Sequence, residues 1–124
     1  MTPTRPYLLR AIYEWITDNG FTPFLLVNAE NSQVTVPNEY VKEGKIILNI
    51  AGTAVSNLSL ENDRVFFDAR FAGRNFSVFI PMQAVLAVYA KENGKGMFFQ
   101  PEDYESTPPP IPPRPTKPVL KRVK

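Results

Sequence analysis

The sequence predicts a mainly β domain that begins with one α-helix and ends in a basic, proline-rich tail. Apolar residues follow helical spacing only between residues 7 and 19, and short apolar runs separated by turn residues follow up to residue 99. No long helical pattern lies between the predicted strands, so a parallel doubly wound sheet is not expected. A small, strongly bent antiparallel sheet or partial barrel fits this pattern better.

Charge and proline divide the chain of 124 residues into a body and an arm. Residues 1–105 carry nine Lys/Arg and twelve Asp/Glu, whereas residues 106–124 carry five Lys/Arg and no acid. The last nineteen residues also hold seven of the thirteen prolines. We therefore expect one domain over 1–105, an extended proline-rich linker over 106–117 and a terminal motif over 118–124, with the tail disordered.

The predicted helix begins near Thr4, a candidate cap, and stops at Gly20. One stripe of apolar residues has helical spacing: Leu8, Ile12, Trp15 and Ile16. Four more apolar residues lie outside that stripe: Tyr7, Leu9, Ala11 and Tyr13. The apolar surface is therefore wider than one core contact needs. It serves either the core alone or also a self-association face.

Short strands are predicted after the helix, at residues 24–27, 34–36, 45–50, 58–60, 64–71, 76–80 and 97–99. Gly73 lies in a short polar loop between two of these strands, which indicates a hairpin. Residues 51–56 are small and predict a turn. Residues 82–90 are apolar throughout and are interpreted as a short helix.

Composition limits the possible chemistry. The chain has no cysteine and no histidine, which removes thiolate chemistry, the commonest general base and the commonest metal ligand. Gly94-Lys95-Gly96 lacks the spacing of a phosphate-binding loop, and the acidic residues are scattered over turns. No signal peptide or membrane span is recognised. We expect a cytoplasmic protein without a cofactor, a metal or an enzymatic activity.

Three binding hypotheses remain open from the residues alone. Three arginines, Arg64, Arg70 and Arg74, are interleaved with Phe66, Phe67 and Phe71 and could form a nucleic-acid stacking platform. In an RNA-binding protein, the basic tail would be a second contact. The net negative body favours instead a β-face of the core with arginine at its margin, where Arg70 beside small Ala69 could pair with a ligand carboxylate. In the tail, residues 112–115 could serve an SH3-type partner.

Many short segments, in order, resemble stringent starvation protein B (SspB), a bacterial adaptor family. The clearest is Arg-Pro-Tyr-Leu-Leu-Arg-Ala at residues 5–11, followed by Tyr-Glu-Trp at 13–15. The other matching segments are residues 18–19, 22–23, 36–37, 39–40, 47–50, 57–58, 69–71, 80–81, 87–90, 92–94, Phe99 and 101–102. The resemblance thus covers nearly all of residues 5–102 and the end of the tail.

The resemblance implies a homodimer of bent, Sm-like β-domains whose helices build the interface, through Tyr7, Leu8, Ala11 and Trp15. It implies a non-enzymatic adaptor that binds the ssrA degradation tag in a groove and docks its C-terminus on the N-terminal domain of ClpX. The groove residues are then Ala51, Ala54, Val55, Phe67, Ala69 and Arg70. The ClpX-docking residues are Pro118, Val119, Leu120, Lys121, Arg122, Val123 and Lys124.

Within this expectation the small alanines permit close backbone approach, Phe67 is a wall, and Arg70 fixes a polar or acidic group of the tag. The sequence also departs from the family pattern. The linker is short, basic and proline-rich where an acidic, flexible one is usual. Asp68 stands where Asn is common, and Ser56 stands where Gly is usual.

Overall fold

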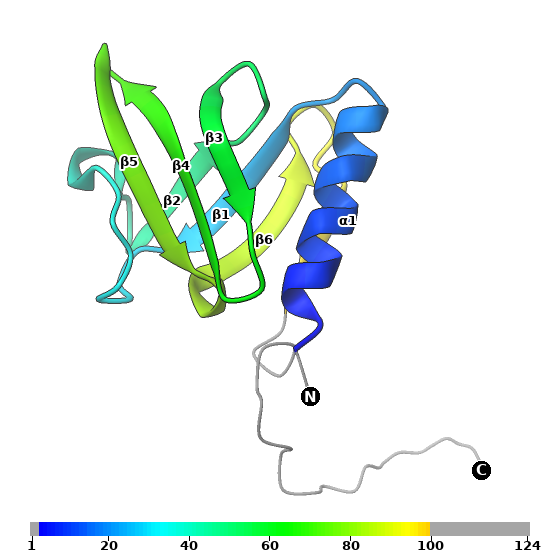
Figure 1. The fold of residues 1–124 in the computed structure, drawn as a ribbon, viewed down its shortest axis with the longest axis horizontal. Coiled ribbons are helices and arrows are strands. Elements are labelled where there is room, and N and C mark those ends of the chain that lie inside the picture. The colour runs from blue at the N-terminus through cyan, green and yellow to red at the C-terminus, as the bar shows by residue number, and fades with distance from the viewer. Residues whose placement is uncertain (1–2, 100–124) are drawn as a thin grey trace, which may run out of the picture.

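The computed structural model describes residues 3–99, which form one helix and two antiparallel sheets (Figure 1). Helix α1 (Arg5–Asp18) precedes seven strands: β1 (Pro23–Asn28), β2 (Lys45–Asn49), β3 (Val55–Leu60), β4 (Arg64–Phe71), β5 (Arg74–Pro81), β6 (Val85–Ala90) and β7 (Gly96–Phe98). Two 3₁₀ turns, η1 (Asn38–Tyr40) and η2 (Met82–Ala84), precede β2 and β6. The predicted mainly β fold with a leading helix is confirmed.

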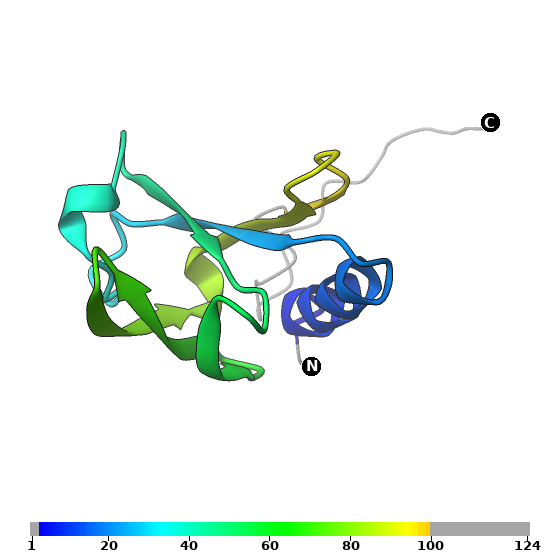
Figure 2. The same cartoon turned by 90° about the horizontal axis from the view of Figure 1, so that it is seen from above.

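The strands form a four-stranded sheet in the order β2-β1-β6-β7 and a three-stranded sheet in the order β3-β4-β5. Thr35 links the sheets, because its N–H donates to the Phe79 carbonyl at 2.8 Å and its carbonyl accepts the Phe79 N–H at 3.1 Å. The two sheets do not close into a barrel. Helix α1 contacts β6, β1, β7 and β3, and so packs along the side where the sheets diverge (Figure 2).

Strand alternation places the core between the sheets. In β2, Ile46 and Leu48 are buried, whereas the residues on either side of them are exposed. In β1, Leu25 and Val27 are buried. Val65 on β4 meets them from the three-stranded sheet. A fully buried side chain of this kind stabilises the fold by about 1.5–3 kcal/mol.

The predicted stripe faces the core only in part, and Leu8 and Ile12 pack against the core as expected. Leu9 and Ile16 are fully buried, whereas Trp15 is 49% exposed. Thr4 occupies the N-cap position, but it lies in the helical region of backbone space and its side chain makes no cap hydrogen bond. The predicted stop is confirmed, since Gly20 has φ of +77° and donates its N–H to the Thr17 carbonyl.

Arg5 fixes the start of α1 against the four-stranded sheet. Its Nη1 donates to the carbonyls of Gln83 at 3.2 Å and Val85 at 2.9 Å, and its guanidinium lies 5.5 Å from the centre of the Phe99 ring. The side chain is buried, so these contacts tie the helix to η2 and to the start of β6. No helix of residues 3–99 is long and apolar enough to cross a membrane.

The prediction of a helix over residues 82–90 is wrong. The segment is η2 followed by β6, which pairs with β1 on one side and β7 on the other. A central strand whose two faces are both covered is apolar at nearly every position. Its sequence therefore lacks the alternation of apolar and polar residues that would distinguish a strand from a helix. Strand β3 also begins earlier than predicted, at Val55, and residues 34–36 contribute only the Thr35 bridge.

Candidate functional site

Strand β4 places the predicted groove residues on two different faces. Phe67 and Ala69 point between the sheets, whereas Arg70 points outward, because consecutive residues of a strand face opposite sides. Phe67 is only 2% exposed and belongs to the core cluster. Ala69 is half-buried, and the strand register pairs it with Val55 on β3 and with Phe76 on β5. We call these three paired residues the rung.

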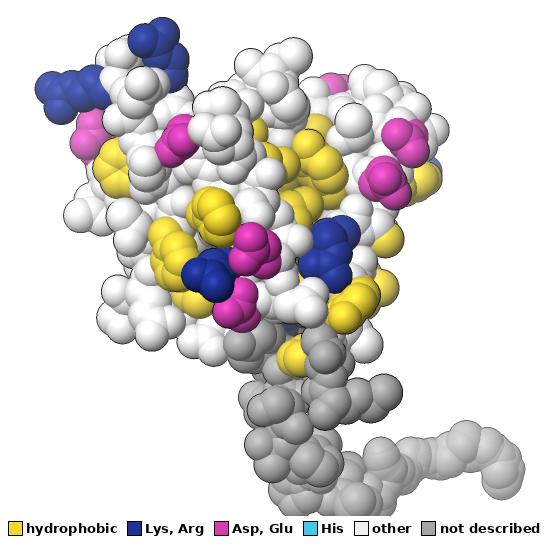
Figure 3. Space-filling view, in the orientation of Figure 1, with side chains coloured by type: hydrophobic (Ala, Val, Ile, Leu, Met, Phe, Trp, Pro, Cys, Tyr) yellow, Lys and Arg dark blue, Asp and Glu magenta, His cyan; other side chains and the backbone are white. Residues whose placement is uncertain are grey.

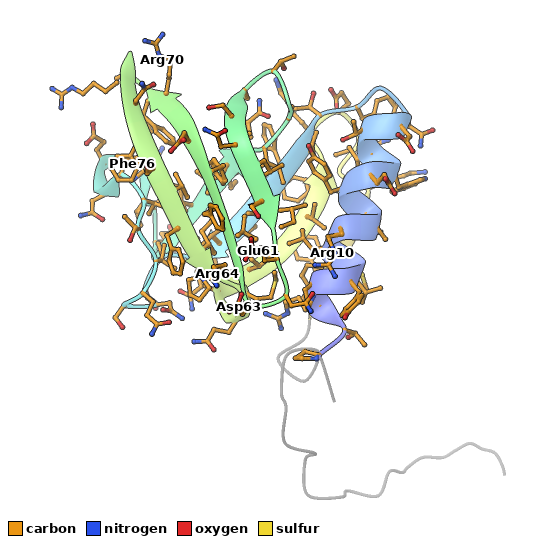
Figure 4. The ribbon with its side chains drawn as sticks, in the orientation of Figure 1. Arg10, Glu61, Asp63, Arg64, Arg70 and Phe76 are labelled. Atoms are coloured by element: carbon orange, nitrogen blue, oxygen red, sulfur yellow. The ribbon has the colours of Figure 1, made fainter. Side chains whose placement is uncertain are left out.

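The remaining predicted groove residues lie around that rung or away from it. Ala51 and Ala54 belong to the loop before β3, where the carbonyl of Ala51 accepts the N–H groups of Ala54 at 2.8 Å and Val55 at 3.2 Å. This turn brings the alanines next to the Val55 end of the rung. Arg70 is exposed and paired with Asn75 near the tip of the β4–β5 hairpin, where it points away from the sheets (Figure 4).

A pocket of about 350 Å³ lies at the hairpin end of the three-stranded sheet. We call it the hairpin pocket, and its lining residues are Val36, Pro37, Asn38, Glu39, Phe71, Arg74 and Phe76. Phe71 and Phe76 meet edge to face with their ring centres 6.0 Å apart, and Tyr40 lies 5.4 Å from Phe71. Phe76 belongs both to the rung at Ala69 and to the lining of the hairpin pocket, so the rung and the pocket adjoin.

The hairpin pocket has a mixed lining, in which apolar and aromatic side chains lie beside one acid, one base and the amide of Asn38. Glu39 comes from η1 and Arg74 from the start of β5, and both are exposed. Its volume lies in the range of small-ligand pockets, roughly 300–1,000 Å³. Such a site suits a short stretch of peptide with small or apolar side chains and a polar or charged group at its edge.

Sequence reasoning missed Phe76, Arg74 and the 36–39 loop as neighbours of Ala69. Part of the signal was present: residues 67, 69 and 71 alternate onto one face of β4. Phe76 follows once the hairpin register pairs it with Ala69. The 36–39 loop is brought in only by the Thr35–Phe79 bridge, which leaves no local pattern in the sequence.

Asp68 lies on the outer face of the three-stranded sheet, on the side opposite to Ala69. Its carboxylate accepts hydrogen bonds from Asn57 Nδ2 at 3.0 Å and Ser77 Oγ at 2.7 Å. These bonds favour the ionised form, and the bond from Asn57 contributes most to a pKa of Asp68 below its ordinary value. Asn57 holds φ of +58°, a conformation that Asn tolerates better than most residues.

The arginines and phenylalanines of the hairpin do not form one platform. Arg64 at the base of β4 pairs with Asp63 at 3.1 Å and Glu61 at 3.4 Å (Figure 4). Phe66 faces outward, while Phe67 faces the core. This arrangement gives little support to the hypothesis of a nucleic-acid stacking platform.

The outward side of α1 carries apolar side chains. Tyr7 is 52% and Trp15 49% exposed, and Ala11 between them is exposed as well, whereas Leu8 is half-buried. Next to Trp15, a second pocket of about 190 Å³ lies between the end of α1 and the β6–β7 loop. Figure 3 also shows hydrophobic side chains at the surface in the opening between α1 and the three-stranded sheet.

Two segments predicted from the sequence, the linker at 106–117 and the terminal motif at 118–124, lie outside the described residues. Within residues 3–99, no group of three or more Asp and Glu side chains is arranged to hold a metal ion.

Taken together, the described residues define a small domain of two diverging β-sheets and one helix, with a pocket at one end and exposed apolar side chains on the helix. The family model for SspB, stringent starvation protein B, matches residues 3–117, and the chain belongs to this family of adaptor proteins. A curated relative, the stringent starvation protein B homolog of Haemophilus influenzae, is 54% identical over 102 residues. The match covers 82% of this chain and 68% of the relative.

Proposed function

We propose that this protein is a non-enzymatic, cytoplasmic adaptor that binds ssrA-type degradation tags and delivers the tagged polypeptides to the ClpXP protease. Membership of the SspB family supports the adaptor role. The observation that carries the binding role is the position of the half-buried Val55–Ala69–Phe76 rung beside the hairpin pocket, which Phe76 also lines.

The proposed tag site is the rung together with the hairpin pocket. Small side chains at Val55 and Ala69 let an extended backbone approach, and Phe71 and Phe76 offer aromatic surface at the end of the path. Ala51 and Ala54 border the other end of the rung. The exposed guanidinium of Arg74 is the cation best placed to meet a polar or acidic group of the tag.

The terminal motif at 118–124 is proposed to dock on ClpX. A micromolar contact corresponds to about −8 kcal/mol. A short tether sets an effective concentration on the order of millimolar, so neither the tag contact nor the ClpX contact has to be tight. Deletion of residues 119–124 should leave tag affinity unchanged and abolish the enhanced degradation of a tagged substrate by ClpXP; loss of tag affinity in this variant would contradict the division of roles.

The helix face formed by Tyr7, Ala11 and Trp15 is proposed as the homodimer interface. Two half-exposed aromatic residues flank a small one, so a second helix can approach closely and cover both rings. Leu8 borders this face and also packs against the core. A dimer would present two tag sites and two tails to one unfoldase.

Fluorescence anisotropy of a labelled ssrA peptide, titrated with the full-length protein, tests the proposed site. Phe76→Ser removes aromatic surface from the hairpin pocket and should weaken peptide binding at least tenfold, or about 1.4 kcal/mol. Phe66→Ser is the matched control, because Phe66 lies on the outer face of the same sheet and should leave affinity unchanged. Equal affinity of both variants, or tight salt-dependent binding of an RNA oligomer in its place, would refute the proposal.

A further inference from the structure

The outer face of the four-stranded sheet carries a row of apolar side chains that crosses all four strands. The strand register pairs Leu26 with Ile47 on β2 and with Ala87 on β6, and it pairs Ala87 with Phe98 on β7. The row therefore reads Ile47, Leu26, Ala87 and Phe98 from one edge of the sheet to the other. We call it the outer row.

Aromatic rings extend the outer row along β6 and β1. Tyr89 stacks on Phe98 with the planes 5° apart and the ring centres separated by 6.3 Å, and it meets Phe24 edge to face at 6.1 Å. Gly96 lies opposite Tyr89, and a side chain there would collide with the backbone of Val88 and Tyr89. The absence of a side chain at Gly96 leaves the Tyr89 ring beside Phe98 uncovered from that strand.

The ends of the outer row are exposed. Phe98 is 64% and Ile47 54% exposed, the highest values among the large hydrophobic side chains of residues 3–99. Helix α1 and the three-stranded sheet both lie on the other side of the four-stranded sheet (Figure 2). Between these ends, Leu26 is half-buried and Ala87 is buried, so the exposed apolar surface lies at Ile47 and at Phe98. Exposed large apolar side chains that cluster on one face commonly mark an interaction site.

The chain itself supplies a segment that fits this surface. The described chain ends at Phe99, directly after Phe98, and the sequence continues with Pro-Pro-Pro-Ile-Pro-Pro-Arg-Pro at 108–115. Proline-rich segments adopt the polyproline II helix, and aromatic-lined surfaces are their usual docking sites because little entropy is lost on binding.

The dimensions agree. Residues 100–107 can reach at most about 27 Å when extended, which is enough to cross the sheet from β7. The eight residues of 108–115 span about 25 Å as polyproline II. The outer row crosses three strand spacings, about 14 Å in all. Because the segment is tethered next to the row, its effective concentration is on the order of millimolar, so even weak contacts suffice.

We propose that residues 108–115 dock intramolecularly on the outer row and on the two rings that extend it, Phe24 and Tyr89. A second copy of the chain is the competing occupant, but on the proposed function the helix face at Tyr7 and Trp15 already serves self-association. Docking of the arm gives it a resting position on the body. If the tail binds ClpX, as the proposed function states, binding to ClpX would compete with docking on the outer row. This consequence rests on the proposed function.

Paramagnetic relaxation enhancement in the full chain tests the inference. The protein has no cysteine, so Thr116→Cys creates a single attachment point for a nitroxide next to the proline-rich segment. We expect the label to broaden amide signals of β1, β2, β6 and β7 strongly and those of β3, β4 and β5 little. Phe98→Ser or Ile47→Ser in the labelled chain should abolish this difference, and Phe66→Ser, on the outer face of the other sheet, should preserve it.

Two results would overturn the inference. One is equal broadening of both sheets in the labelled chain, or none at all. The other comes from a mixture of ¹⁵N-labelled, unmodified protein with nitroxide-labelled ¹⁴N protein. If the amide signals of the four-stranded sheet broaden there as strongly as in the singly labelled chain, the outer row binds a second copy instead. Because tag binding is not measured, these results are independent of the proposed tag site.

Discussion

Replacement of Gly96 by Ala tests the packing of β7 on the four-stranded sheet. An added Cβ would lie closer than 3.0 Å to three atoms, the Val88 carbonyl oxygen and Tyr89 Cα and Cβ, of which the first two are backbone. Backbone cannot rotate away as a flexible side chain can, so β7 must move from β6. This movement would disrupt the pairing of β7 with Ala87, Val88 and Tyr89 on β6. Overpacking of this type costs about 1–3 kcal/mol.

Urea unfolding followed by far-UV circular dichroism gives the free energy of unfolding of Gly96→Ala and of a control, Gly52→Ala. A Cβ added at Gly52 would meet no atom within 4 Å, and Gly52 has no positive φ, so its replacement should be neutral or stabilise by up to about 1 kcal/mol. A destabilisation of about 1–3 kcal/mol confined to Gly96→Ala is the expected result. Equal stability of the two variants would show that β7 is not held at this distance from β6.

Two further predictions concern charged groups. Since Asn57 and Ser77 hold the pKa of folded Asp68 below its unfolded value, ionised Asp68 stabilises the fold above the unfolded pKa, and this contribution is lost as pH falls through the folded pKa. Ser77→Ala should raise the pKa of Asp68 in a ¹³C NMR titration; an unchanged pKa would remove Ser77 as a cause. In peptide anisotropy, Arg74→Gln should weaken tag binding by about 1–3 kcal/mol. Arg70→Gln should weaken it less, and the reverse order would move the charged contact to the hairpin tip.

Much of the fold follows from local sequence patterns. The β4–β5 hairpin is readable from two alternating runs around Gly73, and the end of α1 from Gly20. The face of the helix was harder, because Tyr7, Leu8 and Leu9 are consecutive apolar residues and the local pattern does not state which one meets the core. The buried Arg5 illustrates the same limit, since its partners, Gln83 in η2 and Val85 at the start of β6, are distant in the sequence.

The candidate site was only partly readable. Ala69 and Val55 share a rung as expected of a groove, but Arg70, the next residue after Ala69, faces outward because of the strand pleat. Phe67 was expected as a wall and is a core residue. The loop at 36–39 reaches the pocket through tertiary pairing alone. Ala69 and Arg70 are adjacent in the sequence, but the strand pleat places their side chains on opposite faces of the sheet, so adjacency alone does not place both in one groove.

An NMR titration of the ¹⁵N-labelled full-length protein with unlabelled ssrA peptide tests the central claim most directly, because it reports where the tag binds. We predict that the largest amide shift changes fall on Ala69, Phe71, Phe76 and the 36–39 loop, with little change at Phe66 on the outer face. No change on peptide addition, or changes restricted to the outer faces of the sheets, would contradict a tag site in the hairpin pocket.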